Sequence, residues 1–215
     1  MIYLLIDMIH GKKTLYSKYA INRVIWYLTF SDIFTWGLYM VITTIVGIYL
    51  QNKLGGSALE YIGIGTAIYY LAKGGIQIPI GMITDRIKKD KDDILFLLLG
   101  NILMGIPFFF YPLLQSPLPY FILQFVGGLG AAMNLVNWRK LFAKNLDKGK
   151  EGYNYAVYDT IMSIAGSIFS VAAGFIASVN QVYFDLVIVG IGGLMLSSGI
   201  WVILIYFVNN RNSNK

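Results

Sequence analysis

The chain has 215 residues, of which 57% are hydrophobic and 13% charged, and its mean hydropathy is +0.63. Soluble domains carry about 25% charged residues, so this composition excludes an ordinary soluble domain and fits a lipid bilayer instead. The absence of cysteine excludes disulfides and thiolate metal sites. The formal charge of +6 does not indicate a nucleic-acid partner, because the basic residues are spread between apolar segments.

The first residues, MIYLLIDMIHGKK, do not have the pattern of a secretory signal. Asp7 interrupts the apolar run, the lysine pair follows the run rather than preceding it, and no small-residue cleavage site is present. We expect a short interfacial helix, so residues 1–23 are predicted to be a cytoplasmic N-terminal segment.

Long apolar runs between polar breaks predict an all-α integral membrane protein with six transmembrane helices. The runs are residues 24–50, 59–83, 94–113, 118–138, 154–178 and 182–208. Each is long enough to cross a bilayer with some tilt. They form one predicted transmembrane domain, residues 24–208, followed by a polar tail, residues 209–215.

The basic residues predict the orientation of these spans. Every lysine and arginine except Lys53 and Lys73 falls before span one, in the loops after spans two and four, or after span six. Loops rich in Lys and Arg stay on the cytoplasmic side during insertion. Both termini are therefore predicted to be cytoplasmic, in a multi-pass protein of the plasma membrane.

Spans one and two each carry an ionisable residue, Asp32 and Lys73, roughly 12–15 Å from the cytoplasmic end at 1.5 Å per residue. Charges inside a membrane are costly and often functional. Each residue lies on a polar stripe at helical spacing, and these stripes are expected to line a watery central cavity. The two stripes are Asp32, Trp36, Tyr39 and Thr43, and Thr66, Tyr69 or Tyr70, Lys73 and Gln77.

The similar depth of Asp32 and Lys73 allows an ion pair. One interpretation is structural, in which the pair only holds spans one and two together. In the other, substrate or a proton competes with the pair, so that occupancy biases which side of the cavity opens. The candidate substrate or proton site consists of Asp32, Trp36, Tyr39, Tyr70, Lys73, Gln77 and Gln124.

The loop after span two, GMITDRIKKDKDD, resembles the signature of the major facilitator superfamily of transporters. Matching positions are Gly81, Asp85, Arg86, Lys88 and Lys89, although Lys88 stands where the family usually has a second glycine. In span four, QFVGGLGAA is similar to a second signature of the family, with Gln124 in place of an arginine. Asn134 and Asn137 are expected to bond between helices, and the glycines of spans four and five to allow close packing.

The resemblance implies half of a transporter, because family members usually have twelve helices in two six-helix halves. A lone half would expose polar cavity residues to lipid, which is costly. We therefore expect a parallel homodimer about a twofold axis. Asp85 would then meet the cytoplasmic start of span five of the second copy, where the helix dipole attracts a carboxylate, and Gly81 would allow close approach.

The function predicted in this way is secondary transport of a small-molecule solute by alternating access, with no cofactor and no metal. A membrane enzyme is disfavoured, since the chain has no cysteine, no histidine within a span and no spaced acidic motif. The alternatives are a six-helix channel, for which a filter-like loop is missing, and a non-transporting membrane assembly protein. The sequence leaves the solute and the coupling ion open.

Overall fold

The computed structural model describes residues 20–86 and 90–213, with side chains up to residue 208. Most of the predicted N-terminal segment, together with Lys88 and Lys89, lies outside the described residues. In chain order the elements are α3 (Arg23–Asp32), the π-helix η1 (Ile33–Gly37), α4 (Leu38–Leu54), α5 (Ala58–Arg86), α6 (Asp90–Gly105), α7 (Pro107–Phe110), the 3₁₀ turn η2 (Tyr111–Leu113), α8 (Pro117–Asn145), α9 (Glu151–Ala177), α10 (Gln181–Ser197) and α11 (Gly199–Ser213).

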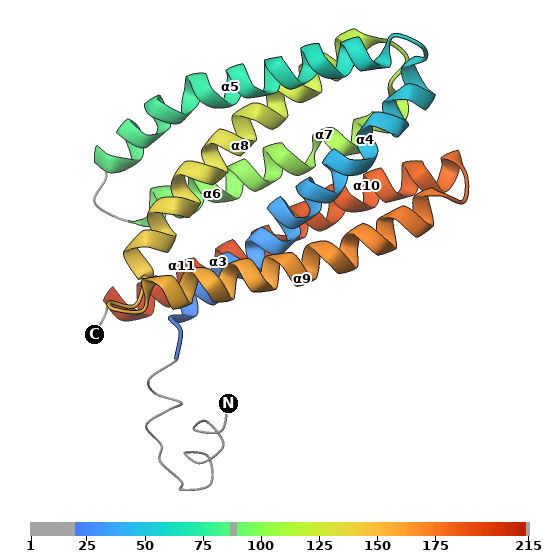
Figure 1. The fold of residues 1–215 in the computed structure, drawn as a ribbon. Helices are drawn as coiled ribbons and strands as arrows, with labels where there is room; N and C mark the ends of the chain where they lie inside the picture. Colours follow the sequence, from blue (N-terminus) through green and yellow to red (C-terminus); the bar gives the residue numbers. More distant parts are fainter. Residues whose placement is uncertain (1–19, 87–89, 214–215) are drawn as a thin grey trace, which may run out of the picture.

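These elements form long helical segments that run back and forth along one another (Figure 1). Five of the segments are long and apolar enough to cross a membrane: Arg23–Leu54, Asp90–Leu113, Pro117–Asn145, Glu151–Ala177 and Gln181–Val208. They correspond to predicted spans one, three, four, five and six. The segment predicted as span two, α5, is 29 residues long, but Lys73, Gln77 and many glycines make it more polar than the others.

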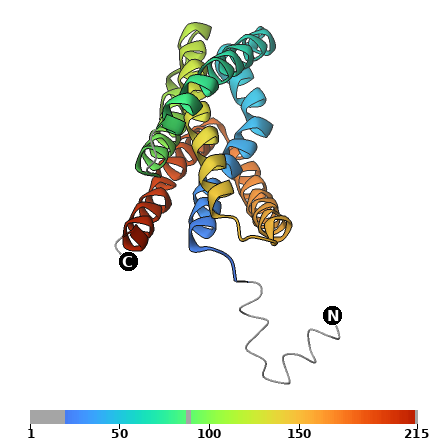
Figure 2. The ribbon, with the colours of Figure 1, turned by 90° about the vertical axis from the view of Figure 1, so that its left-hand side faces the viewer.

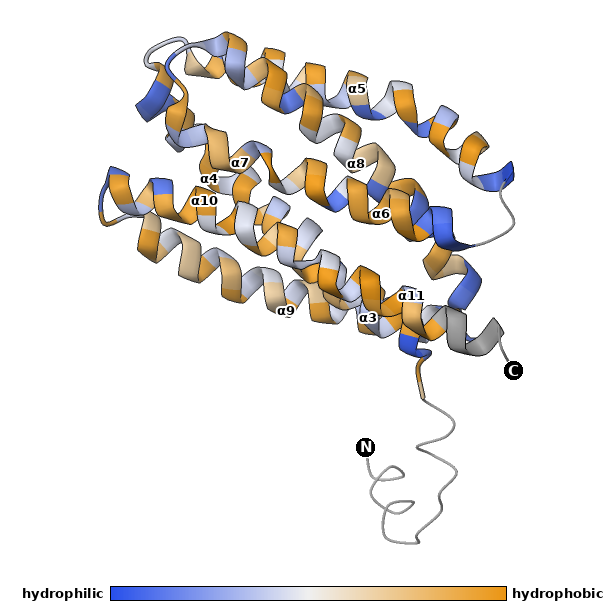
Figure 3. Ribbon diagram, turned by 180° about the vertical axis from the view of Figure 1, so that it is seen from behind, coloured by the Kyte–Doolittle hydropathy of each residue, from blue (hydrophilic) through white to orange (hydrophobic). Residues whose placement is uncertain are grey.

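The helices extend beyond the predicted spans, mainly at one end of the bundle. For example, α8 continues to Asn145 rather than ending near residue 138, and α11 continues to Ser213. We call this the basic end, because the termini of the described chain and the lysine-rich loops lie there; the other end is the opposite end. Figure 3 shows hydrophilic residues gathered at the two ends and hydrophobic ones between them. Gly55, with φ of +79°, ends α4 at the opposite end.

Glycines let α8 pack closely against both α5 and α6. A Cβ atom on Gly128 would lie 2.5 Å from the Tyr69 carbonyl oxygen, and one on Gly130 would lie 2.8 Å from the backbone of Leu103. Small residues at such crossings allow backbones to approach closely, which drives helix association in membranes. The prediction that glycines of span four serve packing is confirmed at these two positions.

The same prediction is wrong for span five within this chain. A Cβ atom on Gly166 or Gly174 would meet nothing within 4 Å, and Ser170 is exposed. The reason is that α9 lies at the edge of the bundle, where few of its residues are buried. The view onto the basic end shows α4 between α5 and α9 on one side of the molecule (Figure 2). We call the surface formed by α4, α5 and α9 the open face.

Candidate functional site

A cavity of about 270 Å³ lies between the first four helical segments and is bordered by residues of the open face. Its lining is mainly apolar and aromatic, with a few polar groups, which is the usual character of a small-molecule site. Three of the predicted site residues, Tyr39, Tyr70 and Gln124, line this cavity. Tyr70 is exposed, and the Gln124 amide donates a hydrogen bond to the Tyr111 hydroxyl at 3.1 Å.

Aromatic rings form the wall of the cavity nearest the basic end. The Tyr39 ring stacks on Tyr69 with centroids 5.7 Å apart, and Tyr69 meets Tyr70 edge to face at 5.3 Å. Trp36 contacts Tyr39 edge to face at 5.5 Å. Offset and edge-to-face pairs of this kind are favourable beyond the area they bury. The wall therefore joins span one to span two.

Lys73 lies against this aromatic wall. Its Nζ atom is 5.2 Å from the centroid of the Trp36 ring and 5.9 Å from those of Tyr69 and Tyr70. Cation–π contacts of this kind stabilise an ammonium group electrostatically without neutralising its charge. Among the described residues, no carboxylate lies within ion-pairing distance of Lys73.

The ion pair considered between Asp32 and Lys73 is therefore not formed in this structure. Asp32 is buried, and its Oδ2 atom accepts a hydrogen bond of 2.5 Å from the Tyr158 hydroxyl of α9. Its Oδ1 atom has no hydrogen-bond partner. The π-helix η1 begins directly after Asp32, and its wider turn separates the directions of Asp32 and Trp36, which a regular α-helix would place on one face.

A buried chain of hydrogen bonds connects the aromatic wall to three further helices. The Trp36 Nε1 atom donates to Asn134 Oδ1 at 2.7 Å, and Asn134 Nδ2 donates to Asn101 Oδ1 at 2.6 Å. Asn101 Nδ2 donates in turn to Ser31 Oγ at 3.1 Å and Ser198 Oγ at 2.7 Å. The expectation that Asn134 bonds between helices is confirmed. Buried networks whose members are satisfied in this way fix one arrangement of helices.

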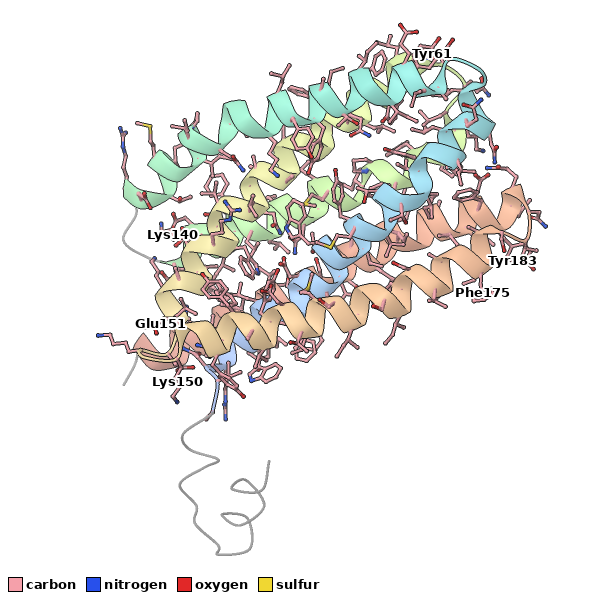
Figure 4. The ribbon with its side chains drawn as sticks, in the orientation of Figure 1. Tyr61, Lys140, Lys150, Glu151, Phe175 and Tyr183 are labelled. Atoms are coloured by element: carbon pink, nitrogen blue, oxygen red, sulfur yellow. The ribbon has the colours of Figure 1, made fainter. Side chains whose placement is uncertain are left out.

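Ion pairs hold the basic end together around Asp93, whose side chain is fully buried. Lys140 lies 2.8 Å from Asp93 and 3.3 Å from Asp85, and Lys144 lies 3.2 Å from Asp93 and 2.8 Å from Asp90. We call these five residues the Asp93 cluster. It ties the end of α5 and the start of α6 to α8, where Figure 4 shows Lys140. A carboxylate shared by two ammonium groups is well compensated despite its burial.

The signature residues that the structure describes lie beside this cluster. Asp85 remains 74% exposed although it contacts Lys140, and the exposed Arg86 ends α5. A Cβ atom on Gly81 would lie 3.8 Å from Val136, an ordinary contact, so the packing of this chain does not require glycine there. Gln77 is half-buried on the same helix, outside the residues that line the cavity.

A second charged cluster lies at the opposite end. Asp185 of α10 accepts a hydrogen bond of 2.7 Å from the Tyr49 hydroxyl and lies 3.1 Å from Lys53 Nζ. The same ammonium group donates to the Pro112 carbonyl oxygen at 3.1 Å. This Asp185 cluster joins spans one, three and six.

Sequence reasoning missed several of these residues. Asp185 is an isolated ionisable residue within an apolar run, and the criterion that selected Asp32 and Lys73 could have found it. Asn101 is polar but not ionisable, so the same criterion passes over it. Tyr158 carried no such signal, because tyrosine is common near span ends. Within the part of the chain that the structure describes, no group of three or more His, Asp or Glu side chains is placed to hold a metal ion.

Comparisons with known proteins give one match. Residues 25–215 match the sequence profile of the family described as Major Facilitator Superfamily. No curated protein and no solved structure matched the chain.

Proposed function

The chain belongs to the major facilitator superfamily, whose members are typically transporters, and from this premise we propose that it moves a small solute across the membrane by alternating access. The main observation that supports this proposal is the cavity of about 270 Å³. It lies in a bundle about half the size of a twelve-helix transporter and is bordered by residues of the open face. Alternating access in this architecture needs a second six-helix unit across that face. We propose that a second copy of the chain supplies it.

The composition of the open face supports this arrangement. On α9 the exposed residues include Asp159, Ser163 and Ser167, which would be costly to place against hydrocarbon. On α5, a Cβ atom added at Gly63 or Gly74 would meet nothing within 4 Å. Small residues at these positions suit close contact with another helix. A twofold axis along the membrane normal would bring α5 of each copy to α9 of the other.

The same arrangement gives Asp85 its proposed role as a gate. Its exposed carboxylate lies at the basic end of α5, where α9 of a second copy would begin. Asp147, Lys148 and Lys150 precede α9 and Glu151 is its first residue, so the formal charges there cancel; Figure 4 shows Lys150 and Glu151 at this end. The partial positive charge of the helix dipole at that end attracts a carboxylate. The gate would close the basic end and open when Asp85 moves away.

Asp32 is proposed to link solute movement to the helices of the open face. Its hydrogen bond with Tyr158 joins span one to α9, and its free Oδ1 atom could accept a proton or a polar group of the solute. A ligand that binds better in one state shifts the equilibrium between states. Transport by Asp32→Asn should therefore be reduced or uncoupled relative to wild type.

Two measurements test the proposal: uptake into liposomes that contain the purified chain, and the oligomeric state of the chain in detergent. We expect a dimer by light scattering in detergent and saturable uptake that Asp32→Asn and Lys73→Ala each reduce by at least about tenfold, the loss expected when a charged contact is removed. Wild-type rates in both variants would contradict the assigned site. Single-channel conductance would indicate the channel alternative, and a stable monomer without uptake would favour an assembly protein.

A further inference from the structure

The charge around the cavity is not balanced. Lys73 has no carboxylate within ion-pairing distance among the described residues, and Arg139 lies close enough to add a second, repulsive positive charge. Asp32, which could have compensated Lys73, is bonded to Tyr158 instead. None of the residues that line the cavity is charged. The rim of the cavity toward the basic end is therefore positive.

Lys73 is also within reach of the cavity. Tyr69 and Tyr70 both line the cavity and contact the ammonium group, and Lys73 follows them by one helical turn. The Tyr69 hydroxyl is buried and makes no hydrogen bond of good geometry, and a buried polar group without a partner is costly. A ligand acceptor placed between this hydroxyl and Lys73 would satisfy both groups.

The remaining walls suit an apolar body rather than a second charge. Met104, Phe108 and Leu123 are apolar. On α8, the Gln124 amide is a neutral polar group that a ligand in the cavity can contact. A cationic solute is the opposing case, since aromatic faces attract cations. Here those faces already hold Lys73, and a second cation beside it would be repelled by Lys73 and by Arg139.

We propose that the solute is a small organic anion, a carboxylate with an aromatic or aliphatic body, that pairs with Lys73 and places its body in the cavity between Tyr39, Tyr70 and Gln124. This inference rests on the proposed transport function and names its substrate class. The aromatic wall then holds Lys73 ready while the cavity is empty, and the carboxylate draws the ammonium group toward the cavity.

Titration of the purified 215-residue chain in lipid nanodiscs tests the proposal. The probes are benzoate, its neutral counterpart benzamide, the cation benzyltrimethylammonium, and hexanoate as an aliphatic anion. Trp36 contacts Lys73, so tryptophan fluorescence should report binding, and Trp36→Phe should remove the signal. We expect benzoate or hexanoate to bind saturably, and benzamide and the cation to bind at least about tenfold more weakly.

Variants of Lys73 separate charge from shape. Lys73→Gln should weaken anion binding at least about tenfold, whereas Lys73→Arg should keep it within about threefold. Lys91→Gln removes the same charge from an exposed position near the start of α6 and should leave binding unchanged. Equal binding of benzoate and benzamide, preference for the cation, or wild-type anion affinity in a folded Lys73→Gln variant would overturn the proposal.

Uptake measurements keep this inference distinct from the proposed function. Saturable uptake of benzamide or the cation, unaffected by Lys73→Gln, would support transport and overturn the anion assignment. Anion binding that depends on Lys73, without uptake in liposomes, would support the anion site and overturn transport.

Discussion

At the scale of single residues, Asn101 holds the interior together. Its side chain donates to Ser31 and Ser198 and accepts from Asn134, so one buried amide joins spans one, three, four and six. Asn137, also fully buried, donates only to a carbonyl of its own helix and leaves its Oδ1 atom without a partner. Removing the two amides should therefore have very different costs.

We predict that Asn101→Leu destabilises the protein by about 2–4 kcal/mol, because it leaves the Asn134 Nδ2 group and the Ser31 hydroxyl unpaired, and an unpaired buried group costs about 1–3 kcal/mol. The Ser198 hydroxyl keeps its hydrogen bond to the Met195 carbonyl oxygen. Asn137→Leu should change stability by less than about 1 kcal/mol, because its acceptor is already unpaired. Thermal unfolding in detergent measures both. Equal destabilisation by the two variants would contradict the role of Asn101.

Asp93 gives a second prediction at this scale. Asp93→Asn leaves Lys140, which is only 18% exposed, without its closest anion, and breaking a buried ion pair in this way costs about 3–5 kcal/mol. Asp90→Asn removes a partly exposed contact to Lys144 and should cost about 1 kcal/mol or less. Melting temperatures at low and high salt measure the difference. The prediction would be refuted if Asp93→Asn lowered the melting temperature as little as Asp90→Asn does, and if high salt reduced that small effect further.

At the scale of helices, two adjacent glycines of α8 have different surroundings. A Cβ atom on Gly128 would overlap the backbone of α5 at Tyr69, whereas one on Gly127 would lie 3.9 Å from the Tyr69 ring. Gly128→Ala should therefore destabilise the contact between α5 and α8 by about 1–3 kcal/mol. Gly127→Ala should be neutral or stabilising by up to about 1 kcal/mol, because alanine favours a helix. Thermal unfolding of the two variants compares them directly, and matching losses would disprove the packing argument.

The helices were largely predictable, because long apolar runs dominate the sequence. The parts of the helices that extend beyond these apolar runs could not be predicted. Lys140 and Lys144 have the character of loop residues, and only their ion pairs with Asp93 of another helix explain why α8 continues through them. The site was predicted in part. Tyr39, Tyr70 and Gln124 line the cavity, but a regular helical period could not show that η1 separates Trp36 from Asp32, which bonds to Tyr158. Contacts between distant helices decide such details, and one sequence does not contain them.

At the scale of the whole molecule, the proposed dimer makes a specific prediction. Gly74 lies 12 residues before the end of α5 at Arg86, and Ser163 lies 12 residues after the start of α9 at Glu151. Both are therefore about 18 Å from the basic end at 1.5 Å per residue. The chain has no cysteine of its own, so any disulfide that forms must join introduced cysteines.

We predict that a chain carrying both Gly74→Cys and Ser163→Cys forms a disulfide-linked dimer on mild oxidation in membranes, because a disulfide needs Cα atoms within about 7 Å. The control combines Gly74→Cys with Ile203→Cys, an exposed position on α11. Non-reducing electrophoresis separates the products. Equal dimer yields from the two chains would argue against contact between α5 and α9 of different copies.

The π-helix in the first span has a consequence for how that span is used. A π turn holds one residue more than the α-helical turn it replaces, so the two parts of the span are out of phase with each other. Before the turn, α3 packs against α8, α9 and α11; after it, α4 packs against α5, α9 and α10. One unbroken span thus serves two sets of neighbours, as two separate helices would. Deleting one of Ile33, Phe34 or Thr35 would restore one common phase, and with it the face that Asp32 and Trp36 would share in a regular helix.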